Sequence, residues 1–136
     1  MVEREKIRIA LVDDHTLFRS GLRGLLSMRE GFEVVADVGS GEEFLDILPS
    51  LEVDVIFMDI SMPGINGAET TRRAMQINPD LHVIALSMYG DDHYYKLMLE
   101  SGASGFVLKD SDIDEVYAAV EAVAQDTMFA AEQELR

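Results

Sequence analysis

No cysteine occurs among the 136 residues of this chain, which excludes disulfide bonds and thiolate metal sites. No apolar run approaches the roughly 20 residues that a helix needs to cross a bilayer. The segment 1–6 carries charges of both signs and lacks the apolar core of a signal peptide. We therefore expect a cytoplasmic protein that makes no contact with a membrane.

Basic residues are also few, because 11 lysines and arginines stand against 26 acidic residues and the formal net charge is −15. An acid excess of this size repels nucleic acid phosphates and anionic lipid headgroups, and no stripe of basic residues interrupts it. We expect no direct binding of nucleic acid by this chain. Most of the acidic residues serve solubility, but three of them occupy positions that indicate a site.

The chain is rich in short apolar segments that alternate with helical patterns. Hydrophobic residues make up 48% of the composition, which suits a globular domain with a full core. Strands are expected at Ile7–Val12, Glu33–Val38, Asp54–Met58, His82–Leu86 and Gly105–Leu108. Helices are expected at Thr16–Met28, Gly41–Leu48, Ala68–Ile77, Asp92–Glu100 and Ile113–Ala124. The alternation predicts an α/β fold, a doubly wound five-stranded parallel sheet with helices on both faces.

Local signals indicate where several helices begin and end. Ser40 is expected to cap the helix at 41–48, and the run Asn78–Asp80 to end the helix at 68–77. Gly102 is well placed to end the next helix in a left-handed conformation. In the first helix, apolar residues are expected together on one side, namely Leu17, Phe18, Leu22, Leu25 and Leu26.

The division into domains follows from the same pattern. The strands at 7–12 and 54–58 are apolar almost throughout, which is typical of strands buried on both faces. No internal repeat or linker is evident. We expect a tail over residues 1–6, one domain over 7–125, and the end of the last helix with a short acidic tail over 126–136.

Three carboxylates follow two of the expected strands. Asp13 and Asp14 come directly after the first strand, and Asp59 after the third. Ligand sites of open α/β sheets lie at the carboxyl ends of the strands, so these side chains are expected to converge. A bare cluster of three carboxylates would be strongly repulsive, and Mg²⁺ relieves such repulsion through oxygen ligands.

Two further polar residues end neighbouring strands. Ser87 follows the fourth strand and Lys109 the fifth. A strand-end carboxylate can act as a nucleophile towards phosphorus and form an aspartyl phosphate. A metal ion, an ammonium and a hydroxyl would then contact the phosphoryl oxygens. The set therefore indicates a site that accepts and holds a phosphoryl group.

Four segments carry these residues: Val12–His15, Met58–Gly67, Leu86–Ser87 and Gly102–Lys109. In this order they resemble the receiver domain of a two-component response regulator, over most of the chain. The resemblance implies a flavodoxin-like fold of five strand–helix repeats with strand order 2-1-3-4-5. More narrowly, Asp-Asp-His, Arg19, Gly21 and Lys109-Asp110 resemble receivers that precede a helix-turn-helix domain of the LuxR/FixJ (NarL) type.

The resemblance implies a role for each acidic residue. Asp59 would be the phosphoacceptor. Asp14 and Asp59 would ligate Mg²⁺ directly with the backbone carbonyl of Ser61, and Asp13 would act at the metal through water. Ser61 and Tyr89 flank the acceptor and would tune the lifetime of the phosphoryl group.

The remaining residues would form the switch. Lys109 would contact the phosphoryl group, and Ser87 would be the hydroxyl that moves towards it. Phe106 would be the switch aromatic, whose ring becomes buried when Ser87 moves. Asp110 stands where many receivers carry a proline after a cis peptide, which leaves the conformation of that loop open.

The resemblance also implies partners and a function. We expect a signalling switch, not an enzyme with an external substrate, that a sensor histidine kinase phosphorylates. Phosphorylation would change the face formed by residues 92–100, 105–108 and 113–124, and would promote a homodimer. The subfamily favours a fragment of a longer transcription regulator, whose DNA-binding C-terminal domain this chain lacks, over a stand-alone receiver.

Alternative interpretations stay open. The first is a Mg²⁺-dependent phosphohydrolase, which usually has a general acid near its nucleophile, whereas Asp59 is followed by Ile60 and Ser61. The second is a degenerate receiver that is never phosphorylated and works as a protein-binding module. A structural alternative is that Asp14 or His15 caps the first helix through its side chain.

Overall fold

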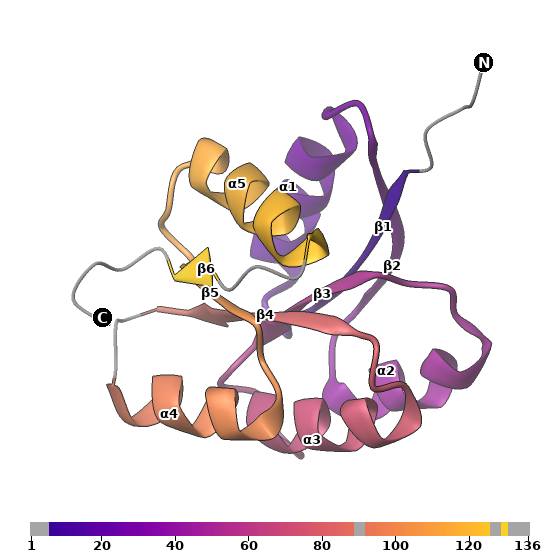
Figure 1. The fold of residues 1–136 in the computed structure, drawn as a ribbon, viewed down its shortest axis with the longest axis vertical. Helices are drawn as coiled ribbons and strands as arrows, with labels where there is room; N and C mark the ends of the chain where they lie inside the picture. Colours follow the sequence, from indigo (N-terminus) through magenta and orange to yellow (C-terminus); the bar gives the residue numbers. More distant parts are fainter. Residues whose placement is uncertain (1–5, 89–91, 126–128, 131–136) are drawn as a thin grey trace.

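Strands and helices alternate along the chain in the computed structural model, which describes residues 6–88, 92–125 and 129–130 (Figure 1). The strands are β1 (Ile7–Val12), β2 (Phe32–Val38), β3 (Val55–Asp59), β4 (His82–Ser87), β5 (Gly105–Leu108) and β6 (Phe129–Ala130). The helices are α1 (Thr16–Ser27), α2 (Gly41–Ile47), α3 (Gly67–Ile77), α4 (Asp92–Ser101) and α5 (Ile113–Ala124), with a 3-10 turn at Leu48–Ser50.

All strand pairs are parallel, and the order across the sheet is β2-β1-β3-β4-β5-β6. Helices α1 and α5 cover one face of the sheet, and α2, α3 and α4 cover the other (Figure 1). The predicted doubly wound α/β fold is confirmed, and so is the order 2-1-3-4-5 of its five principal strands. No described helix is both long and apolar enough to span a bilayer.

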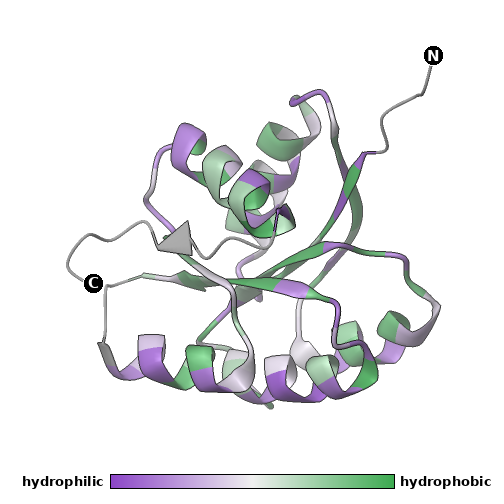
Figure 2. Cartoon of the chain, in the orientation of Figure 1, coloured by the Kyte–Doolittle hydropathy of each residue, from purple (hydrophilic) through white to green (hydrophobic). Residues whose placement is uncertain are grey.

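The core consists of two apolar layers, one on each face of the sheet. In β3 every residue is buried. Val55 and Phe57 face the layer under α1 and α5, whereas Ile56 and Met58 face the layer under α2 to α4. Figure 2 shows hydrophobic residues along the strands and on the sides of the helices that face them. The unbroken apolar pattern of this strand is thus explained by burial on both faces.

The helix ends that were predicted from capping residues, glycine and proline are confirmed. The Ser40 side chain accepts a hydrogen bond from the Glu43 N–H at 3.1 Å and caps α2. Helix α3 ends at Ile77, directly before the run Asn78–Asp80. Gly102 follows α4 with φ +116°, in the left-handed region that glycine adopts without strain.

Two expectations need correction, and the first concerns the apolar side of α1. Leu22 and Leu26 are buried, but Leu17 is 88% exposed and Leu25 is 44% exposed. Leu17 and Leu26 are roughly two and a half turns apart in an α-helix, so they point in opposite directions. The five apolar residues therefore spread around the helix, and only part of them reaches the sheet.

The second correction concerns the carboxyl-terminal segment, expected to hold the end of the last helix and a tail. Helix α5 ends at Ala124, and residues 129–130 form β6, which pairs in parallel with Gly105 and Phe106 of β5. A strand of two residues is too short to leave a periodic pattern, which is why the sequence did not indicate it. The remaining residues of 126–136 lie outside the described part of the chain.

Gly67, the first residue of α3, packs directly against the end of β3. A Cβ atom at this position would lie 2.2 Å from the backbone oxygen of Asp59 and 2.9 Å from the Cα of Ile60. The Gly67 N–H donates a hydrogen bond to the Ile60 oxygen at 3.0 Å. The backbone around Asp59 is therefore held by a close contact that only glycine permits.

We expect Gly67→Ala to lower the free energy of unfolding by about 1–3 kcal/mol, because the backbone at Asp59 must move. Gly24→Ala is the matched control, since a Cβ atom there meets nothing within 4 Å. That change lies inside α1 and should stabilise by about 0.5–1 kcal/mol. Urea unfolding measures both, and a Gly67→Ala variant as stable as wild type would contradict the close contact.

Candidate functional site

Polar side chains meet at the carboxyl edge of the sheet. Asp13 follows β1, while Asp59 and Ser87 are the last residues of β3 and β4. Lys109 follows β5, and its backbone N–H donates a hydrogen bond to the backbone carbonyl oxygen of Ser87 at 2.8 Å. The order β1-β3-β4-β5 thus brings together residues that lie far apart in the sequence.

The acidic residues form a tight cluster. One ligand atom from each of Asp13, Asp14, His15 and Asp59 lies within 4.8 Å of the others. Asp13 is 1% exposed and Asp59 is 3% exposed. Both Oδ2 atoms are buried; Asp59 Oδ2 accepts no hydrogen bond from the described residues, and Asp13 Oδ2 has the Lys109 ammonium at 2.8 Å. Buried carboxylate oxygens with so few donors suit a hard cation such as Mg²⁺, which prefers oxygen ligands.

Lys109 is the cation of the cluster. Its Nζ lies 2.8 Å from Asp13 Oδ2 and 3.5 Å from Asp59 Oδ2, and its side chain is only 6% exposed. One ammonium therefore balances two buried carboxylates, with Asp14 beside them. The site keeps an excess of negative charge that a divalent cation would offset.

Burial and this excess of negative charge both change the pKa of Asp59. Burial raises its pKa to about 7, and the charge of Asp13 acts in the same direction. Lys109 and the hydrogen bond from the Ser61 N–H to Oδ1, at 3.2 Å, only partly offset these effects. The carboxylate form of Asp59 is thus costly in the folded protein without a further positive charge.

A pocket of about 270 Å³ opens beside Asp59. Its lining includes Asp59, Ser61, Ser87 and His15, whose side chains carry a carboxylate, two hydroxyl groups and an imidazole. The pocket therefore reaches a carboxylate that is otherwise buried.

The response regulator receiver domain family matches residues 9–121. The chain belongs to the response regulator receiver domain family. The receiver is 45% identical over 124 residues to the transcriptional regulatory protein DegU of Brevibacillus brevis, with 91% of this chain and 52% of DegU covered. It is 38% identical over 117 residues to the response regulator GacA of Pseudomonas viridiflava, with 86% and 55% covered.

A solved structure is also similar, that of a two-component response regulator of the LuxR family from Aurantimonas. The TM-score is 0.89 at 32% identity, with 96% of this chain and 93% of that chain covered. The broad and the narrow resemblance are thereby confirmed. The receiver spans about half the length of the curated relatives that it matches.

Phe106, the expected switch aromatic, is buried in this structure and packs against Tyr95, with 4.2 Å between the ring centroids. Its movement together with Ser87 stays a prediction. The described backbone contains no cis peptide, so Asp110 continues a trans chain after Lys109. Tyr89 lies outside the described residues.

His15 and Phe18 enter the site although the sequence interpretation gave them no role there. Neither Asp14 nor His15 caps α1 through its side chain, which corrects that alternative. Instead His15 Nδ1 lies 2.8 Å from Lys109 Nζ, and the Phe18 ring centroid lies 4.9 Å from the same atom. The sequence did contain a signal for this contact, because residues 15 and 18 are three apart, about one helical turn, and directly follow the acidic pair.

The raised pKa of Asp59 predicts a pH-dependent stability in the absence of divalent cations. The unfolded carboxyl ionises near its ordinary value of 3.8, but the folded one near 7. Stability from this group is therefore complete below pH 4 and is lost as the pH rises through 7. Asp59→Asn should stabilise by about 1–3 kcal/mol at pH 8, and by little at pH 4.

Urea unfolding at both pH values, with a chelator present, measures this difference. The matched control is Asp80→Asn, which removes an exposed carboxylate away from the site. It should change stability equally little at both pH values. An Asp59→Asn variant no more stable than wild type at pH 8 would show that the carboxylate is not strained by its neighbours.

Proposed function

We propose that this receiver is a phosphorylation-dependent signalling switch that accepts a phosphoryl group on Asp59 from a sensor histidine kinase, with Mg²⁺. The observation that carries the proposal is the state of Asp59, a buried carboxylate with an unbonded oxygen beside a pocket. Asp13 and Lys109 lie in contact with one another next to it. This arrangement supports attack by a carboxylate oxygen on phosphorus.

The donor set supports a magnesium site. Asp14 and Asp59 would ligate the ion directly with the backbone carbonyl of Ser61, and Asp13 would act through water. When bound, the ion would offset the charge of the phosphoryl oxygens and of the carboxylates. His15 is the only nitrogen donor of the described cluster, and oxygen ligands suit Mg²⁺ better.

The transfer itself balances without an added reactant. An Asp59 carboxylate oxygen attacks the phosphorus of a phosphohistidine whose ring is protonated at its other nitrogen. The new P–O bond forms as the P–N bond breaks, and the electron pair of the P–N bond stays on the nitrogen of the departing neutral imidazole. Lys109, 3.5 Å from Asp59 Oδ2, would contact a phosphoryl oxygen. Ser87 lines the same pocket and would donate its hydroxyl to another.

The readout would follow from the new charge. An aspartyl phosphate brings three acceptor oxygens to one point. To reverse the equilibrium between an inactive and an active conformation, the phosphoryl group would have to interact with the active one more favourably by about 5.5 kcal/mol. Ser87 and Lys109 end β4 and β5, so their movement would change the face made of α4, β5 and α5. At Phe106 the change would lie in its contact with Tyr95, because the ring is buried already.

The larger context is part of the proposal. Since the curated relatives are about twice as long, we propose that this receiver controls a transcription regulator whose DNA-binding domain lies outside this chain. We also propose that the receiver is cytoplasmic and makes no direct contact with nucleic acid or membrane. Phosphorylation would promote its homodimer. The receiver would turn over no external substrate.

Intact mass after incubation with acetyl phosphate tests the acceptor. With Mg²⁺ we expect one phosphoryl adduct on wild type and none on Asp59→Asn, because the nucleophilic oxygen is absent there. Chelation of the metal should remove the adduct from wild type. Failure of wild type to form any adduct at short times would favour the unphosphorylated binding module, and sustained release of phosphate from unrelated esters would favour a phosphohydrolase.

Metal binding can be tested separately from phosphorylation. Mg²⁺ at ten times its dissociation constant should raise the free energy of unfolding by about 1.4 kcal/mol. Asp14→Asn should lose most of this gain, because a direct ligand loses its charge, whereas Asp80→Asn should keep it. Urea unfolding across a Mg²⁺ titration gives the comparison. An equal gain in the Asp14→Asn variant would place the ion elsewhere.

A further inference from the structure

The ammonium of Lys109 is enclosed on one side by the first turn of α1. Its Nζ lies 2.8 Å from His15 Nδ1 and 4.9 Å from the centroid of the Phe18 ring. On the other side it contacts Asp13 and Asp59, at 2.8 and 3.5 Å. Two contacts are therefore carboxylates that a metal ion would share, and two belong to aromatic side chains at the start of α1, its N-cap residue His15 and Phe18.

These two kinds of contact respond differently to a divalent cation. A cation held by the carboxylates takes up their charge and repels the ammonium of Lys109 at short range. The face of an aromatic ring attracts a cation through its quadrupole, and a neutral imidazole accepts a hydrogen bond in the tautomer protonated at Nε2. The contact with Phe18 uses no carboxylate oxygen, whereas His15 Nδ1 also lies 3.2 Å from Asp13 Oδ1.

We propose that Phe18 and His15 are positioning residues that keep the ammonium of Lys109 in the acceptor site while metal and phosphoryl donor occupy the carboxylates. The inference rests on the proposed function of Asp59 as acceptor. It adds contacts between Lys109 and side chains at the start of α1 to the contacts of Lys109 with the acidic residues.

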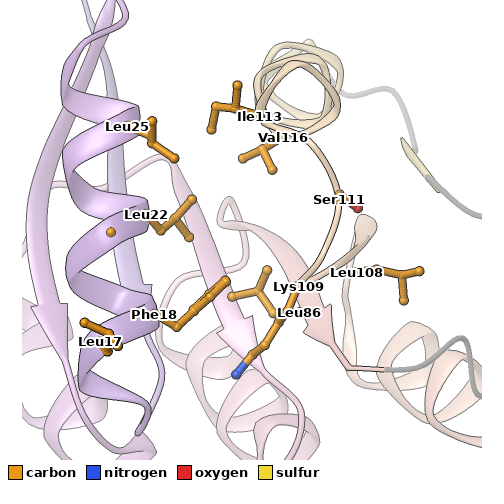
Figure 3. Close-up of a pocket in the computed structure, with 11 residues that line it drawn as sticks. Leu17, Phe18, Leu22, Leu25, Leu86, Leu108, Lys109, Ser111, Ile113 and Val116 are labelled. Atoms are coloured by element: carbon orange, nitrogen blue, oxygen red, sulfur yellow. The ribbon is translucent and has the colours of Figure 1, made fainter.

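Phe18 is held in place by its own surroundings. It lines an apolar pocket of about 240 Å³ between α1 and α5, together with Leu22, Ile113 and Val116. Figure 3 shows Phe18 projecting from α1 and Lys109 from the end of β5 towards the same end of this pocket. Phe18 also packs, partly buried, against the apolar layer under α1 and α5, which restricts the movement of its ring. The backbone N–H of His15 donates a hydrogen bond to Asp13 Oδ1 at 2.8 Å, which holds the backbone from which the imidazole extends.

The contact with Phe18 can be measured directly by NMR. The chain has three lysines, and Lys6 and Lys96 are exposed. The Lys109 side-chain protons should therefore stand apart, displaced upfield by the ring and assigned by their loss in Lys109→Arg. Phe18→Leu should remove the displacement, whereas Phe18→Trp should keep it.

The functional consequence is measured by the rate of Asp59 phosphorylation against acetyl phosphate concentration, at saturating Mg²⁺. At limiting donor, Phe18→Leu should lower the rate by about three- to tenfold, as expected for loss of a partly buried cation–π contact. His15→Ala should lower it by about two- to tenfold, as expected for one hydrogen bond. Phe18→Trp should restore most of the rate, which a purely structural role would not require.

Leu25→Ala is the matched control, because Leu25 lines the same pocket about two turns further along α1. It should leave both the Lys109 signal and the rate unchanged. An equal loss of rate in Leu25→Ala, or an unchanged signal and rate in Phe18→Leu, would overturn the proposal. If wild type forms no adduct, the function proposed for Asp59 fails, and the functional part of this inference fails with it; the NMR comparison then decides the contact alone.

Discussion

The repulsion between buried carboxylates at the ends of β1 and β3 is the constraint on which the rest of this site depends. Asp13 and Asp59 are almost fully buried, and the ammonium of Lys109 lies against both, at 2.8 Å and 3.5 Å. Neighbouring strands of a tightly packed sheet cannot move apart to relieve this charge. The fold therefore holds the cluster in place, and burial, followed by the charge of Asp13, raises the pKa of Asp59 to about 7.

Groups from the neighbouring elements lie against that cluster. The loop after β5 supplies the ammonium of Lys109, and the first turn of α1 encloses it with His15 and Phe18. Gly67 lets α3 approach the backbone of Asp59 closely. The parts of the site thus come from separate elements, and Lys109 after β5 contacts groups at the ends of β1 and β3 and at the start of α1.

Much of the fold and of the candidate site could be predicted from local pattern. The strand Gly105–Leu108 and the helix Ile113–Ala124 have the predicted bounds, and Ser40 caps α2. The predictions that failed involve packing that local pattern does not contain. Leu17 is exposed because the sheet contacts only one stripe of α1, and β6 exists because residues 129–130 pair with the edge strand β5.

The sequence by itself determined the order of strands and helices, and it determined that acids, a serine and a lysine stand at strand ends. Hydrophobic periodicity and the chemistry of strand termini are local properties, and motifs at fixed spacing carry the family. Only the tertiary structure decided that His15 and Phe18 enclose Lys109 and that Asp59 is buried beside Asp13. Distances between side chains on different elements, and the loss of solvent around them, arise only when the layers pack.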